Sequence, residues 1–286
     1  MKLDDSRRSD NVEEDGSGGG IRGIHLGLGG TVLVLVVGYF MGINPLTMLG
    51  LLNGGQTDVA TQSRPVTDQT RDPQIDFVRA VLAETEDVWG AYFHDLGRTY
   101  VRPKLHLFRG SVASGCGMAS TAVGPFYCPG DQKVYLDLGF FSRLSTEFGA
   151  PGDFARAYVI AHEVGHHVQN LLGITDKAAA AERQAGGRPG ANKVSVMVEL
   201  QADCFAGVWA EQADAARRIL EPGDLEAGLR AASSVGDDTL QRREQGTVVP
   251  DSFTHGTSAQ RVGWFRRGFD SGKIDNCNTF SAGTSL

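Results

Sequence analysis

Apolar residues recur at the spacing of an amphipathic helix along several stretches of the chain. The clearest stretch begins at Pro73, and its apolar positions are Ile75, Val78, Val81, Leu82, Val88 and Trp89. The predicted helices cover residues 73–96, 140–148, 154–172, 193–213, 225–232 and 259–269. Two short runs, residues 105–108 and 133–138, are typical of β-strands. This order of elements predicts an α+β domain that is mainly helical with a small sheet.

One apolar segment contains no charged residue. Residues 24–43 are about as long as a helix that crosses ~30 Å of hydrocarbon, and Asn44-Pro45 ends the segment. A buried core helix and a cleaved signal peptide are the alternatives. The polar tail beside the segment disfavours the first, and the length of that tail and the lack of a cleavage site disfavour the second. We therefore predict one transmembrane signal anchor at residues 23–45.

The polar stretches around this anchor define the expected domain layout. Residues 1–22 are charged and rich in Gly and Ser, which predicts a disordered tail. Residues 46–72 form a linker, and residues 73–286 form the folded domain. Basic residues are more frequent just before the anchor than just after it, which favours a cytoplasmic N-terminus. The folded domain is then expected to be periplasmic or extracytoplasmic, in a single-pass topology.

Charge and cysteine content narrow the class of protein. The net charge is -7 and no dense stripe of Lys and Arg is present, so no nucleic-acid partner is expected. Four cysteines in an exported domain predict two disulfides. Cys116 and Cys128 lie close together between Gly and Pro residues and suit a short looped bridge, and Cys204–Cys277 follows by elimination. A four-thiolate zinc site is the alternative, but the chain has no C-x-x-C pair.

The strongest chemical motif is His162-Glu163-Val164-Gly165-His166, inside the predicted helix over residues 154–172. Positions four apart on a helix share a face, so both imidazoles can bind one Zn²⁺ ion. Glu163 is turned by about 100° from His162, toward the open side of the metal. There it can accept a proton from metal-bound water and pass it to a leaving amine. The motif therefore predicts a zinc-dependent hydrolase.

A second acidic motif supplies the third ligand that zinc requires. Glu199 lies 33 residues after His166, and Asp203 follows one turn later on the same helix face. We assign Glu199 as the ligand and Asp203 as the acceptor for the free ring N–H of a ligating histidine, with Asp203 as the rival ligand. Neighbours such as Leu200 and Phe205 argue against a solvated face, because unpaired carboxylates in apolar surroundings are costly.

These motifs resemble those of known metallopeptidases. The pattern H-E-x-x-H followed by E-x-x-x-D on a later helix is similar to the gluzincin class. The chain resembles the bacterial "putative neutral zinc metallopeptidase" family over nearly its whole length, in the segments SDNVEEDG, GPFYCPGDQKVYLD, AHEVGHHVQ, ELQADCFAGVW and THGTSAQRVGWFRRGF. The resemblance implies a zincin-like domain with one zinc ion, bound by His162, His166 and Glu199, and with Glu163 as the catalytic base.

Several other residues are weaker candidates. His255 precedes the last predicted helix and is a candidate donor to the oxyanion of the reaction, with a loop histidine as the alternative. Arg261 is a candidate partner for a carboxylate near the zinc, with a surface ion pair as the alternative. His167 points about 100° away from His166, which favours a place in the core or behind the ligands. The strand over residues 133–138 could present its edge to an extended substrate.

Together these features predict a membrane-anchored zinc metallopeptidase of the bacterial inner membrane. Its expected partners are the membrane, through the N-terminal helix, and a peptide or protein substrate of the cell envelope. A non-catalytic, zinc-stabilised scaffold or binding protein of the envelope is one alternative, and the presence of Glu163 disfavours it. A zinc amidase that acts on cell-wall peptides is the other.

Overall fold

The computed structural model describes residues 1–15, 63–65 and 72–281. The predicted membrane anchor, residues 23–45, lies outside these described residues, and so does most of the predicted linker, residues 46–72. Among the helices that the structure describes, none is both long enough and apolar enough to cross a bilayer.

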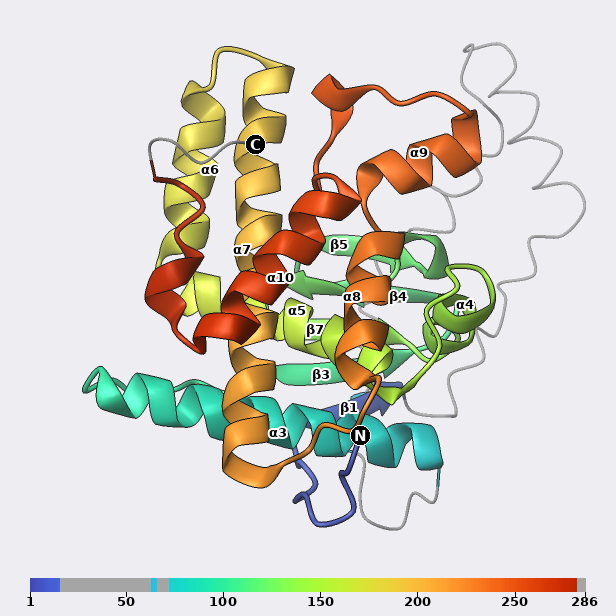
Figure 1. The fold of residues 1–286 in the computed structure, drawn as a ribbon, viewed down its shortest axis with the longest axis vertical. Helices are drawn as coiled ribbons and strands as arrows, with labels where there is room; N and C mark the ends of the chain where they lie inside the picture. Colours follow the sequence, from blue (N-terminus) through green and yellow to red (C-terminus); the bar gives the residue numbers. More distant parts are fainter. Residues whose placement is uncertain (16–62, 66–71, 282–286) are drawn as a thin grey trace, which may run out of the picture. The chain divides into compact units, whose positions relative to one another are not determined.

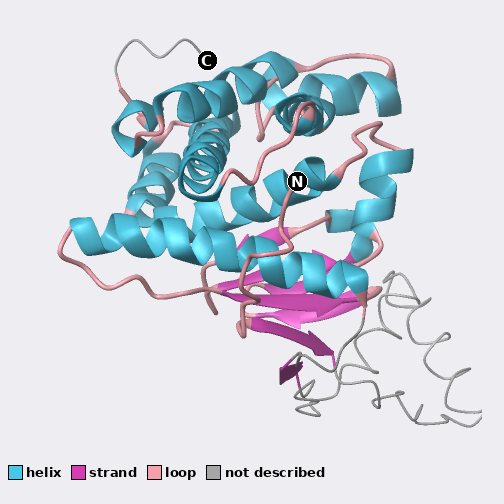
Figure 2. Ribbon diagram, turned by 60° about the horizontal axis from the view of Figure 1, so that its bottom comes forward, coloured by secondary structure: helices cyan, strands magenta, loops and turns pink. Residues whose placement is uncertain are grey.

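Most helices lie on one side of a small sheet, as Figures 1 and 2 show. The helices are α3 (Pro73–Asp95), α4 (Phe140–Thr146), α5 (Asp153–Leu171), α6 (Ile174–Gln184), α7 (Arg188–Arg217), α8 (Asp224–Ser234), α9 (Asp237–Gln245) and α10 (Ser258–Ser271). Short 3₁₀ turns are η1 (Thr121–Val123), η2 (Pro250–Ser252) and η3 (Ile274–Cys277). The prediction of a mainly helical α+β domain with a small sheet is confirmed.

The main sheet has the strand order β2-β1-β3-β7-β6. Its strands are β1 (Val12–Asp15), β2 (Ser63–Pro65), β3 (Lys104–Phe108), β6 (Phe126–Cys128) and β7 (Lys133–Asp137). The strands β1, β3 and β7 are parallel, whereas β6 is antiparallel to β7, with Tyr127 opposite Val134. Because β7 lies between two strands, the expectation that residues 133–138 present an edge is wrong. The edge strand at this end of the sheet is β6.

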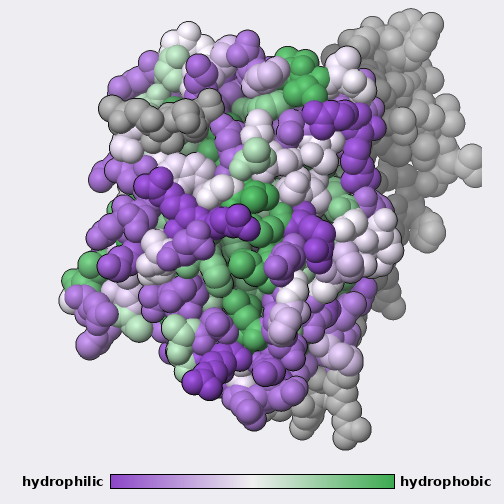
Figure 3. Space-filling view, viewed as in Figure 1, coloured by the Kyte–Doolittle hydropathy of each residue, from purple (hydrophilic) through white to green (hydrophobic). Residues whose placement is uncertain are grey.

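Both faces of the central strands are covered. Leu105 in β3 belongs to the main core beneath the helices. Phe108 and Tyr135 belong to a second, smaller cluster, which the hairpin of β4 (Ser111–Ser114) and β5 (Gly117–Ser120) helps to form. Figure 3 shows that hydrophilic side chains predominate on the face viewed there, as expected for a domain whose apolar residues fill its core.

The helices extend beyond the predicted bounds in the second half of the chain. Helix α7 begins at Arg188, earlier than the predicted residue 193, because Pro189 is well suited to the first helical turn. Helix α9 was not predicted: Asp237 is its one buried residue, so it has no apolar stripe that would indicate a helix. Helix α6 lies in an Ala-rich stretch that none of the predicted helices covers.

The first fifteen residues are ordered, so the predicted disordered tail is corrected for this part of the chain. Val12 in β1 is buried and pairs with Leu105 in β3. Polar contacts hold the preceding residues on α3: the Glu86 carboxylate lies 2.6 Å from the Arg7 guanidinium and accepts a 2.6 Å hydrogen bond from Ser9 Oγ. This order comes from tertiary contacts, which the polar composition of the segment does not reveal.

Both predicted disulfides are present. Cys116–Cys128 joins the turn between β4 and β5 to the edge strand β6. Cys204–Cys277 joins the middle of α7 to η3, across 73 residues of sequence. The four-thiolate zinc site is therefore excluded, because every cysteine of the chain is oxidised.

Candidate metal centre and catalytic site

Helices α5 and α7 pack together at a glycine beside the site. A Cβ atom added to Gly165 would lie 3.1 Å from the carbonyl oxygen of Ala202 in α7. A larger residue at this position would therefore push the two helices apart. The close packing brings Glu199 of α7 beside the two histidines of the motif on α5.

Three side chains converge between these helices. The Glu199 carboxylate lies 3.2 Å from His162 Nε2 through Oε2 and 3.3 Å from His166 Nε2 through Oε1. One ligand atom from each residue lies within 4.8 Å of the other two. Among the residues that the structure describes, this is the one group of His, Cys, Asp and Glu side chains arranged to hold a metal ion.

The outer nitrogens of the two imidazoles show that this group fits a metal. Nδ1 of His162 lies 2.9 Å from Asp203 Oδ1, and Nδ1 of His166 lies 2.9 Å from Gln169 Oε1. With a metal between the Nε2 atoms and Glu199, these oxygens can hold the ring proton on each Nδ1 and leave the lone pair of each Nε2 for the metal. Two imidazole nitrogens and one carboxylate are a known ligand set of catalytic zinc.

The charges around the site also favour a divalent cation. Arg261 Nε donates to Asp203 Oδ2 at 2.8 Å, so these two buried charges compensate each other. Glu199 and Glu163 then contribute two negative charges when the imidazoles are neutral. Burial would lower the pKa of His162, but Asp203 and Glu199 raise it to about 10. The raised pKa of His162 shows that the carboxylates stabilise positive charge where the metal would be held.

A buried polar network orients His162. The Tyr158 hydroxyl donates to Asp203 Oδ1 at 2.5 Å, and Arg261 Nη2 donates to the same oxygen at 3.0 Å. Asp203 and Arg261 thus lie where the sequence analysis expected a partner of a ligating histidine and a partner of a carboxylate. Tyr158 was not among the predicted site residues, although its position one turn before His162 is a signal for it.

A cavity of about 680 Å³ opens beside the three candidate ligands. Glu163 is buried and lines this cavity, and so does His255 from the loop before α10. The edge strand β6 contributes Phe126 and Tyr127 to the wall. The cavity therefore brings together the candidate metal ligands, the candidate base and residues of the edge strand β6.

His255 is held in a turn by a carboxylate that the sequence analysis missed. Asp237 Oδ2 accepts the backbone N–H groups of Thr254, His255 and Gly256 at 2.8, 2.6 and 3.0 Å. Asp237 Oδ1 lies 3.1 Å from His255 Nδ1, and this hydrogen bond raises the pKa of the half-exposed ring. A protonated His255 can donate from Nε2, so its chemistry fits the expected oxyanion donor.

His167 belongs to the core and not to the metal site. Its Nε2 lies 2.6 Å from the carbonyl oxygen of Val101, and its Nδ1 lies 3.1 Å from the Tyr127 hydroxyl. Burial lowers the pKa of His167 to about 4, so the ring stays neutral at physiological pH. His167 therefore anchors α5 against the loop before β3 and against β6.

Comparison with known proteins agrees with this geometry. The profile of a family described as "Putative neutral zinc metallopeptidase" matches residues 1–280. The "Uncharacterized protein YpfJ" of Escherichia coli K12 is 48% identical over 98% of this chain and 99% of its own length. The "Uncharacterized protein Rv2575" of Mycobacterium tuberculosis is 44% identical over 72% of each chain. No solved structure matches.

Proposed function

This chain belongs to the family described as "Putative neutral zinc metallopeptidase", and we propose that it is a zinc-dependent peptidase that hydrolyses peptide bonds with Glu163 as general base. One observation carries the proposal. The two imidazoles of the motif have their Nδ1 atoms bound by acceptors and their Nε2 atoms on the side of Glu199, next to a cavity that Glu163 lines.

Five of the residues that line the cavity have a task in the proposed reaction. His162, His166 and Glu199 would hold the zinc ion. When bound, zinc acts as a Lewis acid that polarises the substrate carbonyl and lowers the pKa of a water ligand toward ~7. Glu163 accepts the proton of the attacking water and delivers it to the nitrogen of the leaving amine. Protonated His255 donates a hydrogen bond to the oxygen that becomes negative during the attack.

The edge strand β6 supports a polypeptide as the substrate. It is the last strand of the sheet and lines the same cavity as Glu163. A peptide in extended conformation can add to such an edge through backbone hydrogen bonds, which hold it without selecting particular side chains. Unfolded or extended segments of envelope proteins are therefore the proposed substrates.

Removal of the metal tests this function. We expect purified protein to contain one zinc ion per chain and to cleave casein, because casein is largely unstructured and can occupy an extended site. Treatment with 1,10-phenanthroline should reduce cleavage to the level of a buffer blank, and one equivalent of zinc should restore it. Magnesium serves as the control, since the imidazole-rich ligand set disfavours it. Cleavage that survives complete removal of the metal contradicts the proposal, whereas bound zinc without cleavage supports the scaffold alternative.

We also propose that the domain works outside the cytoplasm of a bacterial cell, at the inner membrane. The two disulfides support this location, because disulfides persist in oxidising compartments. Residues 1–15 pack together with the domain that begins at residue 72, so both must lie on the same side of the membrane when folded. A single crossing of the membrane by residues 24–43 would separate these two parts, so this packing disagrees both with the predicted single-pass topology and with the cytoplasmic N-terminus that the flanking charges predict.

Labelling of single cysteines tests the location and the side of the N-terminus. Asp5 and Asp95 are both exposed, so Asp5→Cys and Asp95→Cys report on the N-terminal segment and on the domain. In spheroplasts, a membrane-impermeant maleimide is expected to react with both variants before lysis. Reaction of Asp95→Cys only after lysis contradicts the extracytoplasmic location. Reaction of Asp5→Cys alone only after lysis would mean that residues 1–15 remain in the cytoplasm.

A further inference from the structure

A chain of buried side-chain amides leads from a candidate metal ligand to a disulfide. Gln169 Oε1 lies 2.9 Å from Nδ1 of His166, and Gln169 Nε2 donates to Gln201 Oε1 at 3.0 Å. Gln201 Nε2 in turn donates to the carbonyl oxygen of Cys277 at 3.0 Å. Gln169 is 1% exposed and Gln201 is 6% exposed, so water does not replace these contacts.

The partners of these amides fix which way each one points. Gln169 Nε2 also donates to the carbonyl oxygen of Val198 at 2.8 Å. If the Gln169 amide turned over, its nitrogen would face the ring proton of His166, and two carbonyl groups would lose their donor. Gln201 is fixed in the same way, because its oxygen accepts from Gln169 and its nitrogen donates to the Cys277 carbonyl. The acceptor for His166 is therefore oriented by two carbonyl groups, that of Val198 directly and that of Cys277 through Gln201.

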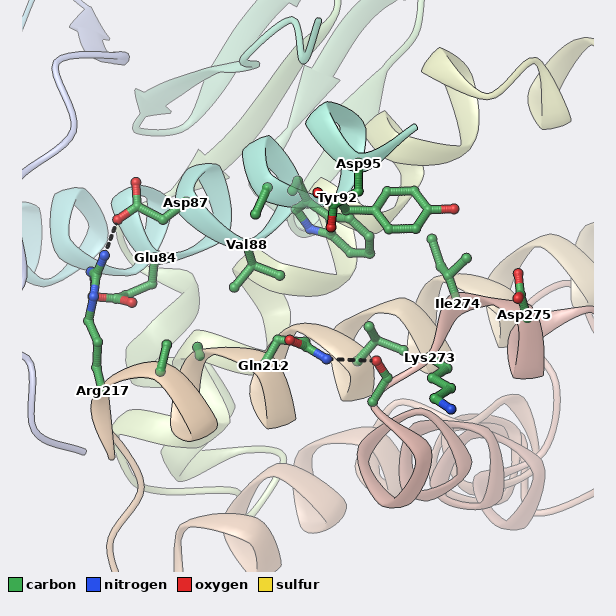
Figure 4. A pocket seen from close by; sticks show the side chains of 16 residues that line it. Glu84, Asp87, Val88, Tyr92, Asp95, Gln212, Arg217, Lys273, Ile274 and Asp275 are labelled. Carbon is green, nitrogen blue, oxygen red and sulfur yellow. Dashed lines mark hydrogen bonds and ion pairs between the residues drawn. The ribbon is translucent and has the colours of Figure 1, made fainter. Parts of the chain in front are cut away.

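The disulfide and several hydrogen bonds hold the segment that carries this carbonyl, among them one of 2.7 Å from Arg267 Nε to the carbonyl oxygen of Asn276. Thr279 Oγ1 donates to the carbonyl oxygen of Met197 at 2.7 Å, on the side of α7. On the other side, Figure 4 shows Lys273, Ile274 and Asp275 across from Tyr92 of α3, and these residues line a separate cavity of about 470 Å³. The bond to Cys204 is the one covalent link between this segment and α7, and the hydrogen bond from Gln212 Nε2 to the carbonyl oxygen of Gly272, at 2.9 Å, adds to it.

His162, the other candidate histidine ligand, is also oriented by a residue of α7 next to Cys204. Cys204 follows Asp203, the acceptor for Nδ1 of His162, and lies three residues after Gln201. Helix α10, which carries Arg261, contacts α7 here so closely that a Cβ atom on Gly268 would lie 1.9 Å from the Cys204 carbonyl oxygen. Gln201 and Asp203, which support the two histidines, thus both lie on α7 within three residues of Cys204.

We propose that Gln169 and Gln201 are positioning residues for the metal site, and that the Cys204–Cys277 disulfide holds them in the arrangement that binds zinc. The chain would then bind zinc weakly while its cysteines are reduced and tightly once this disulfide has formed. The inference rests on the metal site of the proposed function but does not require peptidase activity. Loss of residues that orient metal ligands typically weakens metal binding by about 10- to 100-fold.

The test is the zinc dissociation constant, measured on metal-free protein by competition with a chromogenic chelator. We expect about a tenfold increase for Gln201→Leu and for the pair Cys204→Ala/Cys277→Ala, which has no thiols that could bind zinc. The matched control is Cys116→Ala/Cys128→Ala, which removes the other disulfide and should leave the constant within roughly twofold of the wild type. Thermal unfolding of each variant without metal shows whether it is folded.

Combining the changes separates a positioning role from a merely structural one. If the disulfide acts through Gln201, the triple variant Cys204→Ala/Cys277→Ala/Gln201→Leu should bind zinc about as well as the weaker of its two parents, because the link is already broken. Multiplied losses, or equal losses on removal of either disulfide, would overturn the proposal. Failure of casein cleavage with this pattern intact would refute only the peptidase.

A second pair of variants covers the case in which the cysteine variant does not fold. Gln169→Leu removes the acceptor for Nδ1 of His166, whereas Gln169→Glu retains one. We expect Gln169→Leu to weaken zinc binding by about tenfold or more and Gln169→Glu to recover most of that loss. Equal affinities of the two variants would contradict the positioning role of Gln169.

Discussion

Glu163→Gln is expected to lower the rate of casein cleavage by on the order of 10²- to 10⁴-fold, because glutamine cannot accept the proton of the attacking water. The two side chains have nearly the same shape, so the cavity wall is retained. Glu163 is not in the group of residues that can hold the metal, so the variant is expected to keep one zinc ion per chain. Cleavage assays and metal analysis on the same preparations check both expectations.

A matched control distinguishes a base from a general effect of charge in the cavity. Glu244 lines the same cavity and is exposed, and Glu244→Gln removes one negative charge without touching the candidate ligands. This control is expected to retain cleavage within a few-fold of the wild type. Equal activity of Glu163→Gln and the wild type would eliminate the proposed mechanism. Loss of zinc from Glu163→Gln would instead assign Glu163 a part in metal binding.

The sequence predicted those parts of the site that follow from local geometry. His162 and His166 share a helix face because of the helical period, and the structure places Nε2 of each beside Glu199. The apolar neighbours of Glu199 and Asp203 indicated a helix that faces the core, which is where α7 lies. The two disulfides followed from the number and spacing of the cysteines. Each of these predictions needed only residues close together in the sequence or the number of cysteines.

The sequence did not predict features that depend on contacts between distant segments. Gln169 and Gln201 have no distinctive spacing, and their role depends on the Cys277 carbonyl, 76 residues after Gln201. The edge strand β6 has only three residues, too few to show a period. The N-terminal segment is polar, and its order depends on contacts such as that between Arg7 and Glu86, 79 residues apart. Composition alone favours disorder for such a segment.

Asp203→Ala is expected to cost about 3–5 kcal/mol of unfolding free energy, because it leaves the buried guanidinium of Arg261 without its partner. Arg261 is 4% exposed and Asp203 is fully buried, and Arg261 lowers the pKa of Asp203 against the opposing effect of burial. Urea unfolding of metal-free protein measures the loss. The control is Asp153→Ala, which breaks a partly exposed pair with Arg156 and should cost about 0–1 kcal/mol.

A double variant separates the stability of this pair from its action on the metal. Asp203→Leu/Arg261→Met removes both buried charges and fills much of their volume, so it should recover most of the stability that Asp203→Ala loses. It should not recover zinc affinity, because Nδ1 of His162 still lacks the carboxylate that fixes its tautomer. If zinc affinity instead returned together with stability, the pair would act on the metal only by holding α5, α7 and α10 together. If both stayed low, packing around Tyr158 would be the cause. The expected outcome, stable protein with weak zinc binding, requires that Asp203 orients His162 directly.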